Sequence, residues 1–229
     1  MPAIFAFPLG SLASDEKSPP AVSAPSKPAA CNEKPGDSLE ELWKASDCQF
    51  KNGKELTAVT TLRQISRKFP REIDAYVHAS WLLWREGQNH TDTESRLKWN
   101  DEALEELNKG ARANPSYWEI YTERGDFYFL RLQLLAKAYA DYLLARKYYA
   151  GDEERGVPAA QNGRKAAIED RISRTAEMLD RKGEAVEASC RALFFDPDDG
   201  GARKRLEALS GSCIRKKVRD PRLPPKEHS

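Results

Sequence analysis

One spacing recurs three times in this chain and limits the folds that it can adopt. In each copy, a proline is preceded by small or apolar residues twelve, eight and five positions earlier. The copies are Ala58, Leu62, Ile65 and Pro70; Ala103, Leu107, Gly110 and Pro115; and Ala185, Ser189, Ala192 and Pro197. Steps of four and three keep these positions on one face of a helix, which the proline then ends. A recurring helix of this kind predicts a stack of similar helical units.

The rest of the sequence also favours helices over strands. Residues 39–209 contain nearly all the aromatic residues and carry apolar residues at helical spacing throughout. No run of alternating β-branched residues occurs, and no Asn-Gly or Asp-Gly pair joins two apolar segments. Because these are the main sequence signals of strands and hairpins, the expected fold class is all-α.

With the recurring positions aligned, the chain resembles the tetratricopeptide repeat (TPR) family. That repeat has a large apolar residue at position 4, small residues near 7 and 8, glycine near 15, alanine at 20 and 27, and proline at 32. The residues at the corresponding positions are Leu42, Ala45, Ser46, Gly53, Ala58, Ile65 and Pro70; Tyr76, Ala79, Ser80, Gly87, Ala103, Gly110 and Pro115; Tyr121, Arg124, Gly125, Ala138 and Ala145; and Ile172, Gly183, Ala185, Ala192 and Pro197. The resemblance covers about 160 residues. It implies an α-solenoid of antiparallel helix pairs, a TPR-like superhelix, with about four degenerate repeats.

An insertion sets the second repeat apart from the family pattern. Eleven extra residues lie between Gly87 and Ala103. Within them, Thr91 and Glu94 have the spacing of a capping box, in which a hydroxyl and a carboxyl cap each other's backbone at a helix start. The insertion is therefore expected to lengthen the second helix of this repeat at its N-terminal end.

The third and fourth repeats also depart from the pattern. Repeat three has one extra residue and no terminal proline, and the segment between Tyr149 and Ala166 breaks the register. These two repeats are therefore expected to meet at a wider angle. After Pro197, the segment Ala202–Leu209 predicts a helix that covers the apolar face of the last repeat.

Composition divides the chain into four segments. Residues 39–209 are the predicted repeat domain, between a Pro/Ala/Ser linker at 15–38 and a basic tail at 210–229, both expected to be disordered. Residues 1–14 are apolar and end in a manner that suits signal peptidase, but they have no basic n-region. They are either the end of a signal peptide that begins upstream, which implies a periplasmic or extracellular protein, or the apolar terminus of a cytoplasmic one.

The four cysteines fit no metal-binding or redox spacing. Their wide separation makes reduced thiols the default expectation. If the chain is exported, the plausible bridges are Cys31–Cys48 and Cys190–Cys213, since each joins a tail to the nearest helix.

Charge gives no global signal for nucleic acid or membrane binding. The chain has 37 basic and 36 acidic residues, a net charge of +1. No apolar run approaches the roughly 18 residues of a membrane-spanning helix. From Ala202 to Ser229, nine basic and three acidic residues leave a local excess of +6. This tail is expected to be solvated, and its alternative role is an electrostatic arm of a nucleic-acid-associated accessory protein.

Signatures of catalysis are missing from the sequence. It contains no nucleotide-binding glycine loop, no Gly-x-Ser-x-Gly motif and no His-Glu-x-x-His motif. None of the three histidines lies three to five residues from another histidine or a cysteine, as zinc ligands usually do. We therefore expect no enzymatic activity, no cofactor and no metal.

The resemblance instead implies a binding groove, which the first helix of each repeat lines in this family. The residues at the groove positions are Trp43, Asp47, Phe50, Asp74, His78, Trp81, Trp84, Arg85, Glu119, Glu123, Asp126 and Phe129. Aromatic side chains beside charges are typical of protein-binding surfaces. We expect a scaffold or adaptor that binds an extended or helical segment of another protein, with basic or apolar segments favoured by the acids. The alternative is that the aromatic residues fill the core between repeats.

Overall fold

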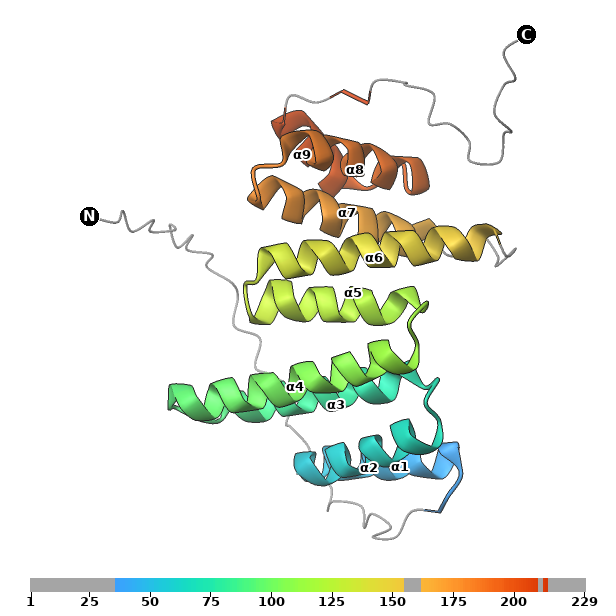
Figure 1. The fold of residues 1–229 in the computed structure, drawn as a ribbon, viewed down its shortest axis with the longest axis vertical. Helices are drawn as coiled ribbons and strands as arrows, with labels where there is room; N and C mark the ends of the chain where they lie inside the picture. Colours follow the sequence, from blue (N-terminus) through green and yellow to red (C-terminus); the bar gives the residue numbers. More distant parts are fainter. Residues whose placement is uncertain (1–35, 155–161, 210–211, 214–229) are drawn as a thin grey trace, which may run out of the picture. The chain divides into compact units, whose positions relative to one another are not determined.

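The computed structural model describes residues 36–154, 162–209 and 212–213. Its elements are α1 (Leu39–Lys51), α2 (Glu55–Lys68), α3 (Ile73–Gln88), α4 (Thr93–Ala113), α5 (Trp118–Asp126), η1 (Phe127–Arg131), α6 (Leu135–Glu154), α7 (Asn162–Met178), α8 (Lys182–Phe195) and α9 (Gly200–Ala208). All regular structure in the described ranges is helical, which confirms the expected all-α class (Figure 1).

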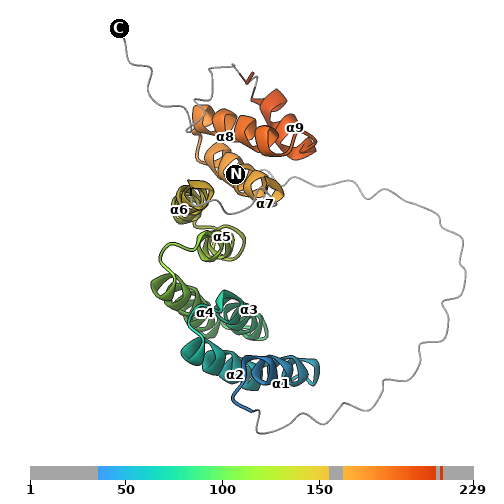
Figure 2. The same cartoon turned by 90° about the vertical axis from the view of Figure 1, so that its right-hand side faces the viewer.

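The helices form pairs that follow one another along the chain. Helix α1 packs on α2, α3 on α4, α5 on α6, and α7 on α8, and each pair also contacts the next (Figures 1 and 2). This is the solenoid of helix pairs that the repeat spacing predicts. The predicted leader and linker lie outside the described residues, apart from 36–38, and so does the tail, apart from 212–213.

Four alanines confirm the alignment of the repeats. Ala58, Ala103, Ala138 and Ala185, one at position 20 of each repeat, are all 0% exposed. Each lies on the second helix of its pair, where a larger side chain would hold the paired helices apart. The repeat pattern is therefore the packing pattern of the core.

Glycine plays the same part at the closest approach of α5 and α6. A Cβ added at Gly125 would lie 2.5 Å from the ring of Tyr142, which is fully buried. The Tyr142 hydroxyl donates to Asp126 Oδ1 at 2.7 Å, so the ring is held and cannot yield easily. This contact brings the third helix pair together and orients Asp126.

The insertion in the second repeat lengthens a helix, as predicted, but the cap lies elsewhere. Helix α4 has 21 residues and begins at Thr93, with Asp92 as its N-cap. The Asp92 carboxylate accepts from the backbone N–H of Ser95 at 2.7 Å. The capping box predicted at Thr91 and Glu94 is therefore wrong by one residue, because the aspartate takes the position from which it reaches the free N–H groups of the first turn.

The extra residue of repeat three is absorbed by a π-helical turn. After Asp126 the chain continues as η1, and the N–H of Leu132 donates to the carbonyl of Phe127 at 3.3 Å, five residues earlier. One inserted residue in a helix is commonly accommodated as such a turn, and π-turns often occur at functional sites. The turn rotates the following side chains relative to an unbroken α-helix. The predicted wider angle between repeats three and four depends on residues 155–161, which lie outside the described residues.

Buried charges link the last two helix pairs. The Glu169 side chain on α7 is 0% exposed and accepts from Arg146 of α6 and Arg191 of α8, each at 3.0 Å, and from the Tyr149 hydroxyl. A buried carboxylate with several donors is costly to remove, because its partners then lose their counter-charge. This cluster therefore fixes the arrangement of three consecutive helices.

A short helix and a disulfide end the repeat array. Helix α9, capped by Asp199, packs on α8 and α7 and corresponds to the predicted covering helix. Cys190 of α8 is bonded to Cys213, so the default expectation of reduced thiols is wrong here and the alternative pairing is present. Cys48 is also disulfide-bonded, but Cys31, its expected partner, lies outside the described residues. No helix within the described ranges is long and apolar enough to cross a bilayer.

Candidate functional site

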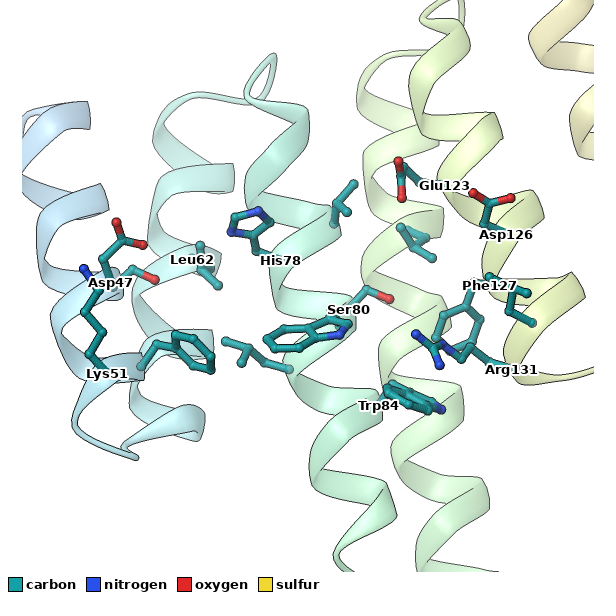
Figure 3. Close-up of a pocket in the computed structure, with 17 residues that line it drawn as sticks. Asp47, Lys51, Leu62, His78, Ser80, Trp84, Glu123, Asp126, Phe127 and Arg131 are labelled. Atoms are coloured by element: carbon teal, nitrogen blue, oxygen red, sulfur yellow. The ribbon is translucent and has the colours of Figure 1, made fainter. Parts of the chain in front are cut away.

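A cavity of about 570 Å³ opens between the first helices of three successive repeats (Figure 3). We call it the groove cavity. Its walls come from α1, α3 and α5 with η1, and its floor includes two leucines of the second helices. The lining residues are Ser46, Asp47, Phe50, Lys51, Leu62, Val77, His78, Ser80, Trp81, Leu82, Trp84, Leu107, Glu123, Asp126, Phe127, Leu130 and Arg131.

Seven of the twelve predicted groove residues line this cavity. They are Asp47, Phe50, His78, Trp81, Trp84, Glu123 and Asp126. The other five do not line it: they are Trp43, Asp74, Arg85, Glu119 and Phe129. Trp43 packs edge-on against His78 at 5.4 Å between ring centroids, and Phe129 lines a separate cavity of about 210 Å³ next to α7.

The aromatic residues form one wall and are partly covered by arginines. Phe50 of α1 and Trp81 of α3 meet edge-on with ring centroids 5.6 Å apart. The guanidinium of Arg85 lies 5.5 Å and 5.4 Å from these two ring centroids. Trp81 remains 41% exposed, whereas Phe50 is half-buried against the core. The expected core-filling role thus applies to part of this set, and Trp81 is available for contact with a partner.

Trp84 lies under a second arginine, supplied by η1. The guanidinium of Arg131 is 3.6 Å from the centroid of the Trp84 ring (Figure 3). Such stacking is favourable because the ring face is electron-rich. The cation at this end of the groove cavity is therefore Arg131, which the sequence pattern did not place there.

The predicted acids are not equivalent. Asp126 accepts two hydrogen bonds from Arg171 of α7, at 2.7 and 2.8 Å, and Glu119 is paired with Arg164. Glu123 lies between these two on α5, lines the groove cavity and has no ion pair or hydrogen bond to another described residue. Two of the three α5 acids are therefore neutralised within the chain.

The surroundings of Glu123 raise the pKa of its carboxyl. The main cause is that the helices around the cavity displace water from the side chain, although it stays open to solvent. The second cause is the negative charge of Asp126, which Arg171 partly offsets. Glu123 therefore supplies a negative charge that has no direct ion pair within the described residues and that Arg171 compensates only in part.

Ser80 and Arg131 line the cavity although the repeat pattern did not assign them to the groove, whereas Leu130 occupies a groove position of repeat three. Ser80 was assigned to a packing position, and its side chain is buried, yet its hydroxyl has no hydrogen-bond partner within the described residues. Leu130, 59% exposed, and Arg131 are carried into the cavity by η1. The extra residue of repeat three was the available signal for Arg131, because an inserted residue in a helix predicts a π-turn.

The described side chains offer no metal centre. No group of three or more histidine, cysteine, aspartate or glutamate residues in these ranges is arranged to hold a metal ion. The side chains that line the groove cavity offer apolar contact, stacking and carboxylates that can accept hydrogen bonds.

Comparison with known proteins shows the fold. No family model and no curated protein matches this sequence. Solved structures do match it. The thermophilic TPR protein TTC0263 of Thermus thermophilus is 22% identical with a TM-score of 0.52, covering 75% of this chain and 80% of that one. The protein MamA, at 12% identity and a TM-score of 0.51, covers 72% and 81%, and an RS-1 MamA double mutant, at 14% and 0.52, covers 77% and 85%. The chain has the helical-repeat fold of TPR proteins.

Proposed function

We propose that this chain is a protein-interaction scaffold or adaptor that binds an extended or helical segment of a partner in the groove cavity. The observation that carries the proposal is that Trp81 of α3 and Leu130 of η1 both line one open cavity and expose large apolar side chains, 41% and 59%. Exposed apolar side chains gathered at one place on a protein commonly mark a surface that a partner covers.

The charge of the groove cavity sets the kind of segment that it favours. Glu123 and Asp47 line it without an ion pair to any described residue, and Asp74 lies nearby with its charge equally uncompensated. A partner with basic residues beside apolar ones would satisfy both the acids and the aromatic wall. Because Asp126 and Glu119 are already paired, this preference depends on fewer acids than the sequence pattern implied. No catalytic step forms part of the proposal.

The alternative, a nucleic-acid-associated protein acting through the basic tail, gains no support from the described residues. Arg205 is paired with Asp170 at 2.6 Å and with Glu177 at 3.2 Å, so its charge is used within the chain. Arg203 donates to the carbonyl of Pro197 at 2.7 Å. A phosphate-binding surface needs several basic side chains without carboxylate partners, and on α9 only Arg203 and Lys204 lack one within the described residues.

Selection of peptides by the full chain tests the proposal. A random peptide library displayed on phage is selected on the immobilised protein, and the enriched peptides are synthesised with a fluorescent label. Their affinity is then measured by anisotropy for the wild type and for Trp81→Ala. Loss of a central aromatic contact typically costs about 2 kcal/mol or more, so we expect roughly thirtyfold weaker binding.

The matched control is Phe194→Ala, which removes the most exposed aromatic side chain among the described residues, 71% exposed and outside the cavity. We expect this variant to bind the peptides as the wild type does, and both variants to keep the helical spectrum. Peptides that bind Trp81→Ala and wild type equally would refute the groove cavity as the binding site. Failure to enrich any peptide would refute the proposal for short linear segments.

A further inference from the structure

Arg131, at the η1 end of the groove cavity, has no carboxylate partner among the described residues. Its guanidinium carbon lies 3.6 Å from the centroid of the Trp84 ring, so the side chain rests on the face of the indole (Figure 3). This contact is favourable and holds the arginine at the edge of the cavity. The ring supplies no oxygen acceptor, and the N–H donors of the guanidinium therefore remain available to a ligand.

The neighbouring arginines have their charges compensated within the chain. Arg171 and Arg174, which line the smaller cavity next to α7, each pair with an aspartate, at 2.7 and 3.0 Å. Arg85, which contacts the aromatic wall, pairs with Glu55 at 3.2 Å. Arg131 differs from these three because its guanidinium faces a cavity and has no counter-charge in the described part of the chain.

The other charges of the cavity place an anion at Arg131 rather than elsewhere. Lys51 also lines the cavity without a carboxylate partner in the described ranges, but Asp47, one turn earlier on α1, lines it too and offsets the lysine charge. One turn before Arg131 lies Phe127, which carries no charge. Glu123, eight residues before Arg131, repels an anion from the α5 part of the same wall.

We infer that Arg131 binds the side-chain carboxylate of an aspartate or glutamate in the partner segment. A planar guanidinium group matches a carboxylate through two parallel hydrogen bonds. Because the Trp84 ring already holds this side chain, less conformational freedom is lost when the carboxylate binds. A phosphate group is usually bound by a cluster of arginines, whereas here one uncompensated guanidinium suits a single carboxylate.

This inference rests on the proposed function, because it assumes that a protein segment enters the groove cavity. It adds an acidic residue to the basic and apolar residues already expected in that segment. The cavity is acidic beside Glu123 and basic beside Arg131, so the partner segment carries its base towards α5 and its acid towards η1. A segment with basic and apolar residues alone would leave Arg131 without a counter-charge and would bind less tightly.

Parallel selection of peptides tests the carboxylate position. A random library is displayed at the N-terminus of a phage coat protein, so that its peptides have no free C-terminal carboxylate. It is selected on the full chain as wild type, Arg131→Gln and Arg131→Glu, each checked for a helical spectrum. We expect the wild type to enrich peptides with an aspartate or glutamate, Arg131→Gln to lose this enrichment, and Arg131→Glu to enrich a lysine or arginine instead.

The matched control is Arg96→Glu, which changes the net charge as much as Arg131→Glu does. Arg96 is an exposed arginine of α4 that lacks a carboxylate partner within the described ranges and does not line the groove cavity. We expect it to enrich the same acidic peptides as the wild type. If Arg96→Glu lost the acidic preference as well, net charge would explain the preference and the carboxylate position would be overturned.

Affinity measurements on the wild type do not depend on the folding of any variant. One enriched peptide is synthesised with an amidated C-terminus and a fluorescent label, together with a counterpart in which its acid is replaced by the matching amide. We expect anisotropy to show about tenfold tighter binding of the acidic peptide, since hydrogen bonds between charged groups are worth more than neutral ones. Arg131→Gln should bind the two peptides equally.

The contrary results separate this inference from the proposed function. Equal binding of the acidic and amide peptides by the wild type, or enrichment of acids by Arg131→Glu, overturns the carboxylate position. If those peptides still depend on Trp81, the proposed function stands. A wild type that enriches no peptide overturns both.

Discussion

At Glu123 the folded chain holds a carboxylate beside Asp126 and one turn from Glu119, with no ion pair to any described residue. The pKa of this carboxyl is raised, first by loss of water around the side chain and second by the charge of Asp126. A carboxyl whose pKa is higher in the folded chain than in the unfolded chain opposes folding once it is ionised. A charge that destabilises the fold is consistent with a role in binding, since binding sites often retain such costs.

The pH dependence of stability tests this reading of Glu123. Below the ordinary carboxyl pKa of about 4.5, the side chain is protonated in both states and costs the fold nothing. As the pH rises through the raised folded pKa, ionisation lowers the free energy of unfolding. We therefore expect Glu123→Gln to raise the melting temperature at pH 7, with the gain shrinking towards pH 4.

The control for this measurement is Glu187→Gln, an exposed carboxylate on α8 that has no such surroundings. Thermal unfolding followed by circular dichroism at both pH values gives the comparison. If Glu123→Gln raised the melting temperature equally at pH 4 and pH 7, or lowered it at pH 7, the conclusion that the ionised Glu123 carboxylate destabilises the fold would be wrong.

At the scale of the helices, small residues decide how closely the pairs approach. Ala138, on α6, is 0% exposed and occupies the same repeat position as Ala58, Ala103 and Ala185. Ala140 lies two residues further on the same helix and faces solvent. Two residues correspond to about 200° of rotation, so the same helix offers a buried and an exposed alanine of equal propensity.

Replacing each of these two alanines by leucine separates the effect of packing on the free energy of unfolding from the effect of helix propensity. We expect Ala138→Leu to destabilise by roughly 1–3 kcal/mol, because the larger side chain must enter a close contact between helices. Ala140→Leu should change the free energy of unfolding by less than about 0.5 kcal/mol. Urea denaturation measures both, and equal stabilities would show that the repeat register is misplaced.

At the scale of the whole chain, the apolar face of the last helix pair has to be covered. The Cys190–Cys213 disulfide joins residues 23 apart in sequence and encloses α9, the helix that covers α8. A disulfide limits the freedom of the unfolded chain, and a loop of this length is worth roughly 3 kcal/mol in the chain-entropy view. Disulfides persist mainly in oxidising compartments.

The contribution of this disulfide to stability is measured by substitution of its cysteines, because a reductant would also reduce the disulfide of Cys48. We expect the Cys190→Ser, Cys213→Ser double variant to unfold at a melting temperature several degrees below the oxidised wild type. Protease cleavage should then begin at α9, while α1 to α6 keep their helical signal. A melting temperature equal to that of the wild type would mean that the bridge does not hold the cap in place.

The sequence by itself determined where the helices lie, which residues face their partners, and which helices line the groove. The positions and the buried faces of the helices follow from spacings of three and four residues, which any sequence displays directly. The helices that line the groove follow from the resemblance to the TPR repeat. It also placed Asp47, Phe50, His78, Trp81, Trp84, Glu123 and Asp126 at one cavity, because the repeat position dictates the face.

Only the tertiary structure decided the charge of that cavity. Glu119 and Asp126 are neutralised by Arg164 and Arg171, each 45 residues away, and Arg131 reaches Trp84 through a π-turn. Whether such distant side chains meet depends on how helices pack and on which rotamers the packing allows. Local periodicity does not encode these distances, and so the uncompensated carboxylate of Glu123 and the unbonded hydroxyl of Ser80 emerged only when the helices were assembled.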